Sequence, residues 1–241
     1  MPSPLRPIYG ALTGVALLLA ALRPGLAAAP DVIVYCDPTL VPAVRDVGQL
    51  FTARSQATVD VFTAPPPLML AQLARQVQND ALITQTAWMD RAEASGLLKP
   101  GTRTGSWRNS LVIAGKSGGA KTDGVFARTD PTPAATIDGP AILTALALQP
   151  AHVIGAANSG GVAFLLDTGV AQQGLLHLTD VRANPGLAVL QPVPDGAYPP
   201  IVYVAALTKL TQSVNAQAFL DFLHTPEANS RLHAAGLETV P

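Results

Sequence analysis

The chain has 241 residues, 49% of them hydrophobic and 13% charged, so we expect a folded protein with a full core rather than a disordered one. The formal net charge of −1, from 15 Lys and Arg against 16 Asp and Glu, leaves no basic stripe, and nucleic acid is excluded as an expected partner. The 20 glycines and 22 prolines indicate many turns, as in an α/β chain with frequent corners between strands and helices.

The first 29 residues have the parts of a secretory signal. Arg6 lies in a short polar lead, an apolar stretch runs from Ile8 to Leu22, and an alanine run at Ala27 to Ala29 follows. We therefore expect residues 1–29 to be a signal peptide and the remainder to be exported. An uncleaved membrane anchor is the alternative, but the stretch is shorter than the ~20 residues that a spanning helix needs, and Arg23 interrupts its end.

The segment after the signal is predicted to form a strand, a tight corner and a helix. Val32 to Tyr35 is a short apolar run, Cys36-Asp37-Pro38-Thr39 forms the corner, and a helical pattern begins at Leu40. Thr39 is the expected N-cap. In an open α/β sheet the free N–H groups of such a helix face a crevice, where a small ligand, above all an anion, can bind without a catalytic side chain. A capped helix without a ligand is the alternative.

The same unit is predicted twice more. A strand from Thr58 to Phe62 ends in a proline-rich corner through Pro67 and leads to a helix. A third strand, Ala81 to Thr84, leads to a helix that starts near Thr86 and ends at Gly96. Three successive units of this kind predict a parallel sheet covered by helices, because each crossover must be right-handed.

A second α/β pattern follows a short strand at 111–114 and a glycine-rich break at 115–124, which we interpret as a domain crossover. After Pro199-Pro200, an apolar strand at 201–207 is expected to return the chain to the first sheet. The other expected elements are strands at 125–127, 152–154, 174–176 and 187–190, and helices at 140–148, 160–167, 214–223 and 226–235.

The order and spacing of the corners resemble the periplasmic molybdate-binding proteins of ABC importers, which are type II solute-binding proteins. The likeness covers nearly the whole chain after the signal, and its motifs are specific as a set rather than singly. They are Cys36-Asp37-Pro38-Thr39-Leu40, Pro66 to Leu73, Trp88-Met89-Asp90 with Gly96-Leu97, Asn109-Ser110-Leu111-Val112, Asp130-Pro131, Asn158-Ser159, Gly174-Leu175-Leu176-His177 with Thr179-Asp180, and Ala218 to Leu223 with Pro226-Glu227-Ala228.

The resemblance implies the two-lobed type II periplasmic binding protein fold, an α/β fold in which each lobe is a mainly parallel sheet flanked by helices. Lobe I would comprise residues 30–114 and 200–241, lobe II residues 115–199, with two crossovers between them. The lobes would close on an oxyanion, such as molybdate or tungstate, held by hydroxyl and backbone N–H groups. It also implies a monomer without enzymatic activity or cofactor, which presents its ligand to an ABC permease in the inner membrane.

The ligand residues implied by the resemblance are partly changed in this chain. The first ligand serine of the family falls on Thr39, which keeps a hydroxyl, and the second falls on Pro66, which has neither hydroxyl nor N–H. The ligand tyrosine falls on His177, and the valine that binds through its N–H falls on Ser159. The expected ligand-binding residues are therefore Cys36, Asp37, Thr39, Pro66, Ser159 and His177.

These changes leave a second function open, a periplasmic module that has lost oxyanion binding. Cys36, Asp37 and His177 would be able to ligate a borderline metal or to orient a polar organic ligand. However, a lone cysteine after a strand is most often a small buried residue, and an aspartate before proline is most often a turn former, so we assign no metal site. A hydrolase with Cys36 as nucleophile and His177 as base is a more distant alternative, because the sequence indicates no third orienting group.

Overall fold

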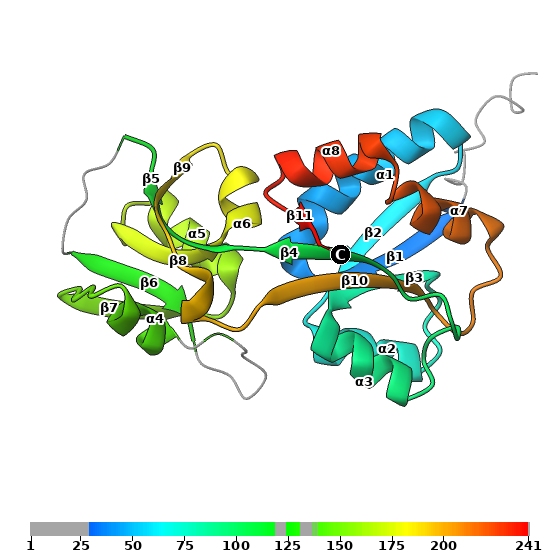
Figure 1. The fold of residues 1–241 in the computed structure, drawn as a ribbon, viewed down its shortest axis with the longest axis horizontal. Helices are drawn as coiled ribbons and strands as arrows, with labels where there is room; N and C mark the ends of the chain where they lie inside the picture. The colour runs from blue at the N-terminus through cyan, green and yellow to red at the C-terminus, as the bar shows by residue number, and fades with distance from the viewer. Residues whose placement is uncertain (1–28, 119–123, 131–136, 138, 241) are drawn as a thin grey trace, which may run out of the picture.

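Two separate sheets, each flanked by helices, form the two lobes of the molecule (Figure 1). The structure, a computed structural model, describes residues 29–118, 124–130, 137 and 139–240. The expected signal peptide lies outside these residues except for its last one. Within the described part of the chain, no helix is long and apolar enough to cross a membrane.

The first sheet contains six strands in the order β11-β4-β10-β3-β1-β2. The pairs β1–β2 and β1–β3 are parallel, as the repeated strand, corner and helix units predicted, and β10 returns to this sheet antiparallel to β3. The elements of lobe I are β1 (Val32–Cys36), η1 (Pro38–Leu40), α1 (Val41–Ser55), β2 (Val59–Thr63), α2 (Pro66–Ala74), β3 (Ala81–Gln85), α3 (Thr86–Ala94), β4 (Thr104–Asn109), β10 (Ile201–Leu207), α7 (Val214–Phe222), α8 (Pro226–Ala234) and β11 (Glu238–Thr239).

The second sheet contains five strands in the order β7-β6-β8-β5-β9. Here β6 pairs in parallel with β7 and β8, whereas β5 is antiparallel to β8 and β9. The elements of lobe II are β5 (Leu111–Lys116), β6 (Val125–Thr129), α4 (Gly139–Ala145), β7 (His152–Ala156), α5 (Ser159–Asp167), β8 (Gln173–His177), α6 (Leu178–Arg182) and β9 (Leu187–Pro192), and η2 (Asp195–Ala197) follows on the way back to lobe I.

The first crossover lies at Ser110, earlier than the glycine-rich break at 115–124 suggested. Strand β5 pairs only with β8 and β9 of the second sheet, so residues 111–114 belong to lobe II rather than to lobe I. The apolar side chains of β5 are buried among those strands and helices of lobe II, and this burial fixes the boundary. Both sheets are also mixed rather than mainly parallel, because the strands next to the crossovers run against their neighbours.

Alternation of side chains along β1 places the first corner firmly in the core of lobe I. Val34 and Cys36 face one side of the sheet, in the cluster that includes α1, α7 and α8, and Tyr35 faces the other side with α2 and α3. Figure 1 shows these two layers of helices above and below the sheet. The edge-to-face contact of Phe51 with Phe219, 5.4 Å between ring centres, joins α1 to α7. The start of η1 is therefore held by packing on both faces of its strand.

Candidate ligand site between the lobes

The donors of the corner after β1 are bound by a carboxylate of the same corner, that of Asp37. Asp37 is the N-cap of η1, and its Oδ1 accepts hydrogen bonds from the backbone N of Thr39 (3.2 Å) and from Thr39 Oγ1 (3.0 Å). Asp37 rather than Thr39 is thus the residue that caps the helix. An anion bound at a helix start uses such N–H and hydroxyl donors, and in this corner a side chain of the chain itself already occupies them.

A buried tyrosine of β10 contacts this corner. Tyr203 on β10 is fully buried, and its hydroxyl lies 2.8 Å from Thr39 Oγ1. Burial raises the pKa of Tyr203 well above its usual range, so the hydroxyl keeps its proton. Burial also raises the pKa of Asp37, an effect that the hydrogen bonds from Thr39 and the nearby charge of His177 partly offset. Lobe I therefore presents a buried acid joined to two hydroxyls.

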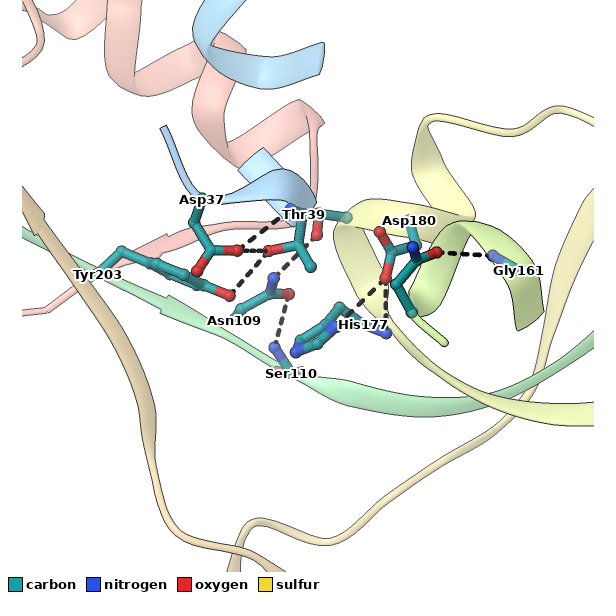
Figure 2. Close-up of polar contacts among 10 residues, drawn as sticks. Asp37, Thr39, Asn109, Ser110, Gly161, His177, Asp180 and Tyr203 are labelled. Carbon is teal, nitrogen blue, oxygen red and sulfur yellow. Dashed lines mark hydrogen bonds and ion pairs between the residues drawn. The ribbon is translucent and has the colours of Figure 1, made fainter. Parts of the chain in front are cut away.

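The corner after β8 has a related arrangement in lobe II. Asp180 Oδ2 accepts a hydrogen bond from the backbone N of His177 (3.2 Å) and lies 3.2 Å from His177 Nδ1. The imidazole is buried, and its Nε2 has no hydrogen-bond partner among the described residues. Figure 2 shows the ring extending from Asp180 toward Asn109 and Tyr203. Nδ1 is therefore placed to donate to the carboxylate, and Nε2 lies on the far side of the ring from Asp180.

Residues of the first crossover join the two corners. Asn109 Nδ2 donates to Thr179 Oγ1 at 2.9 Å, and the carbonyl of Ser110 accepts the N–H of Leu178 at 2.8 Å. Asn109 Oδ1 in turn accepts the N–H of Ser110 at 3.0 Å. We call the polar residues at this junction the seam cluster. It consists of Asp37, Thr39, Asn109, His177, Asp180 and Tyr203, which Figure 2 labels, and Thr179, the partner of Asn109.

A cavity of about 310 Å³ lies against the seam cluster, between helices of the two lobes. Thr39 and Thr179 line it and belong to both the cavity and the cluster. Arg182 on α6 and Arg231 on α8 also line it, and small residues of α1, α6 and α8 form much of the remaining wall. The carboxylate of Asp46 lies 3.9 Å from Arg231, both half exposed, which is a weak pair.

Comparison with known families identifies this two-lobed architecture. Residues 32–238 match the model of the bacterial extracellular solute-binding protein family. The chain belongs to this family. It is a solute-binding protein that resembles molybdate-binding members, in agreement with the resemblance seen in its sequence.

Three known proteins are similar to this solute-binding protein over most of its length. The aconitate isomerase of a Pseudomonas species is 24% identical, over 93% of this chain and 94% of that protein. The molybdate-binding protein ModA of Escherichia coli is 24% identical, over 89% and 91% of the two chains. The solved structure of the periplasmic molybdate-binding protein of Azotobacter vinelandii superposes with a TM-score of 0.70 at 18% identity, over 87% of this chain and 99% of that one.

Three of the six residues expected at the site lie together in the seam cluster, namely Asp37, Thr39 and His177. Cys36 is adjacent but fully buried, with its Sγ 3.5 Å from the carbonyl oxygen of Asp37. Burial raises the pKa of the Cys36 thiol well above its usual range, so it is a poor nucleophile and a poor metal ligand. Among the described residues, no group of three or more His, Cys, Asp or Glu is placed to hold a metal ion.

Pro66 and Ser159 lie at helix starts outside the seam cluster and do not line the cavity. Pro66 is the first residue of α2, between Pro65 and Pro67, and none of the three has an N–H to donate. Ser159 begins α5, where the Asn158 side chain accepts the N–H of Gly161 at 3.0 Å. Neither helix start adds a donor to the seam cluster.

Several residues of the seam cluster and the cavity were not assigned to the site by the sequence analysis, although Asn109, Thr179 and Asp180 stand in the motifs of the resemblance. A tyrosine in the otherwise apolar strand 201–207 was the best available signal, since a buried hydroxyl needs a partner. Asp180, three residues after His177, fits a helix-start box. Arg182 and Arg231 gave no signal, because exposed arginines on short helices look like ordinary surface residues. The missed residues are Asn109, Thr179, Asp180, Arg182, Tyr203 and Arg231.

Proposed function

We propose that this solute-binding protein encloses a small anionic solute, either an oxyanion or an organic acid, in the cavity between its lobes. One observation carries the proposal: each lobe contributes one threonine and one arginine to the lining of the same cavity. Thr39 and Arg231 come from lobe I, and Thr179 and Arg182 from lobe II. Guanidinium groups bind carboxylates and oxyanions through paired, charge-assisted hydrogen bonds. The volume of about 310 Å³ falls at the lower end of the range of small-molecule sites, about 300–1,000 Å³.

The charges that line the cavity favour an anion. Two guanidiniums face a single carboxylate, Asp46, and its contact with Arg231 is long. Arg182 has no ion-pair partner among the described residues. A solute that bridges Arg182 and Arg231 would hold the lobes together, which is how closure of a two-lobed binding protein can be coupled to binding.

The names of two relatives, the aconitate isomerase and the molybdate-binding protein ModA, support an anionic solute, since aconitate and molybdate both carry negative charge. We also propose that the protein works in the periplasm, delivered there by the signal in residues 1–29, and that it presents its solute to an ABC permease of the inner membrane. The absence of enzymatic activity remains a prediction, because one of the relatives is named as an isomerase.

Thermal unfolding of the purified protein with a panel of anions tests this function. The panel is molybdate, tungstate, sulfate, phosphate, citrate and cis-aconitate. A ligand present at 100 times its Kd stabilises the folded state by about 2.7 kcal/mol, or about 5 to 11 °C in Tm for a chain of this size.

The variants Arg182→Gln and Arg231→Gln each remove one charged donor and are expected to weaken binding of the active anion by about 10- to 100-fold, about 1.5–3 kcal/mol. Arg75→Gln is the matched control, because Arg75 is exposed at the end of α2 and does not line the cavity. The proposal fails if no anion raises Tm, or if both cavity variants bind as tightly as the control.

A further inference from the structure

The C-terminal end of α8 contacts lobe II beside the cavity. Gly236 follows α8 and its C-cap, and the two residues before it, Ala234 and Ala235, line the cavity from lobe I. Opposite Gly236 lies α6 of lobe II, with the side chains of Leu178 and Arg182. Figure 1 shows the segment between α8 and β11 facing α6. Because Arg182 lines the cavity from the other side, the contact lies where the two walls of the cavity meet.

This contact leaves no room for a side chain on lobe I. A β-carbon at Gly236 would lie 2.8 Å from Cγ and 3.2 Å from Cδ2 of Leu178, and 3.4 Å from Cγ of Arg182. Carbon atoms in favourable contact are about 3.5–4.0 Å apart, so the distances to Leu178 would force the two segments apart. The φ of Gly236 is +96°, which also favours glycine. Position 236 therefore requires glycine for two separate reasons, the backbone and the approach of lobe II.

A second glycine of lobe I has the same place at a helix end without the contact. Gly96 ends α3 as Gly236 ends α8: the N–H of each bonds to the carbonyl three residues earlier (2.9 Å), and the next N–H bonds to the carbonyl five residues before it (3.0 Å). The φ of Gly96 is +64°, and a β-carbon there would meet no atom of the described residues within 4 Å. The close approach at Gly236 is thus separate from the requirements of the helix end.

The contact also lies close to the first crossover. Strand β11 begins two residues after Gly236 and pairs with β4, with Glu238 opposite Arg108, two residues before the crossover at Ser110. A small separation near the point about which two bodies turn becomes a larger separation farther away. A side chain at Gly236 would therefore move the cavity wall on α6 away from the wall on lobe I.

We propose that Gly236 is a positioning residue for the solute. Because it has no side chain, α6 approaches lobe I closely enough for one anion to contact Arg182 and Arg231 together. Gly236 does not itself line the cavity, so it acts only through α6. The proposal rests on the proposed function, since it concerns the affinity for a solute in that cavity. Loss of the close approach would lower this affinity without removing any donor, because binding and the approach of the lobes are coupled.

Gly236→Ala tests the proposal, with Gly96→Ala as the matched control. The cost of overpacking falls on the arrangement in which the lobes meet, so Kd should rise about 5- to 150-fold in Gly236→Ala relative to the control. Titration calorimetry measures Kd for each anion that raises the Tm of the wild type, among molybdate, tungstate, sulfate, phosphate, citrate and cis-aconitate. If an alanine variant does not fold, asparagine replaces alanine at both positions, because it tolerates a positive φ and still brings a β-carbon.

Leu178→Ala separates the contact from backbone strain. The strain of a side chain at positive φ is the same with and without Leu178, whereas the close contact with Cγ and Cδ2 is lost. In a Leu178→Ala background, Gly236→Ala should therefore change Kd by no more than about twofold.

Equal Kd values in Gly236→Ala and Gly96→Ala would overturn this proposal and leave the solute-binding function intact. A rise in Kd of the same size with and without Leu178 would also overturn it, because the effect would then come from the backbone alone. If no anion of the panel binds the wild-type protein, the proposed function fails and the positioning role fails with it.

Discussion

The corners after β1 and β8, one in each lobe, share an aspartate at the start of a helix but differ in which polar group each corner presents. In both corners an aspartate accepts a backbone N–H at the start of a helix, Asp37 from Thr39 and Asp180 from His177. After β1 the acid precedes the helix and is itself buried, so the corner ends in a carboxyl group. After β8 the acid lies within the helix and also contacts Nδ1 of His177, so the corner ends in an unpartnered imidazole nitrogen.

The position of the acid relative to the helix start therefore decides which group it supports. The carboxylate of Asp37, before the helix, holds its own corner through Thr39, whereas that of Asp180, inside the helix, supports the imidazole of His177. The same change, aspartate to asparagine, should therefore have different consequences in the two lobes, and the predictions below use this contrast.

The largest effect is expected for Asp180→Asn. The amide still accepts the backbone N–H of His177 but loses the charge in the largely buried contact with Nδ1, so the free energy of unfolding in urea should fall by about 1.5–3 kcal/mol. Affinity for cis-aconitate, measured by titration calorimetry, should change little, because Asp180 does not line the cavity. Asp60→Asn, at an exposed position of β2, is the control. An unchanged free energy of unfolding in Asp180→Asn would break the contrast between the corners.

Asp37→Asn should instead strengthen anion binding. The amide oxygen can still accept both hydrogen bonds from Thr39, but the negative charge beside the cavity is gone. We expect the Kd for phosphate and for cis-aconitate to fall about tenfold, equivalent to about 1.4 kcal/mol. Titration calorimetry at neutral pH measures it. Equal or weaker binding in the variant would show that Asp37 does not act as an internal competitor of the solute.

The same variant predicts a smaller effect on stability as a function of pH. Burial raises the pKa of Asp37 above its ordinary value of 3.8, so the folded chain holds this proton to a higher pH than the unfolded chain does. The contribution of this group to the free energy of unfolding therefore falls as pH rises from 3.8 through the raised pKa, and stays at its lower level above it. Urea unfolding of the wild type and Asp37→Asn across this window measures the difference. A difference that is constant with pH would contradict the assignment.

The smallest effect is expected at Cys36, which lies beside Asp37 but takes no part in the contrast. The thiol is fully buried and its pKa is raised by burial, so iodoacetamide should label it only in urea and not in the native protein. Cys36→Ala should leave anion affinity unchanged. Mass spectrometry of the labelled protein gives the readout, and rapid labelling of the native chain would revive a reactive role for this residue.

Sequence reasoning located most of the fold because its signals are local. Short apolar runs in the sequence predicted the strands β1, β2, β3 and β10, and the structure confirms them. Strand β4 was missed because Thr104 to Asn109 is largely polar, and it becomes a strand only by pairing with β10 and β11. The five-residue helix α6 was missed for a related reason: too short for an apolar period, it is fixed by its helix-start box and its neighbours.

The sequence predicted site residues only at the corners between a strand and the following helix. Asp37 directly follows β1, Thr39 lies in the same corner and His177 ends β8, and the family resemblance predicted that they would come together. Tyr203 reaches Thr39 across 164 residues of sequence, and Asn109 reaches Thr179 across 70. Pairings of that range depend on which strands become neighbours, which no local pattern specifies.

The proline-rich start of α2 has a consequence for the hydrogen-bond donors that this corner can offer. Pro65, Pro66 and Pro67 fix three successive backbone torsions, so this stretch is stiff even before the chain folds. It lies beside the first corner, since Cys36 pairs with Thr63 two residues earlier. Re-creating a hydrogen-bonding loop there would require replacing several residues at once and would add freedom to the unfolded chain. No single substitution can therefore restore a set of backbone donors at this corner.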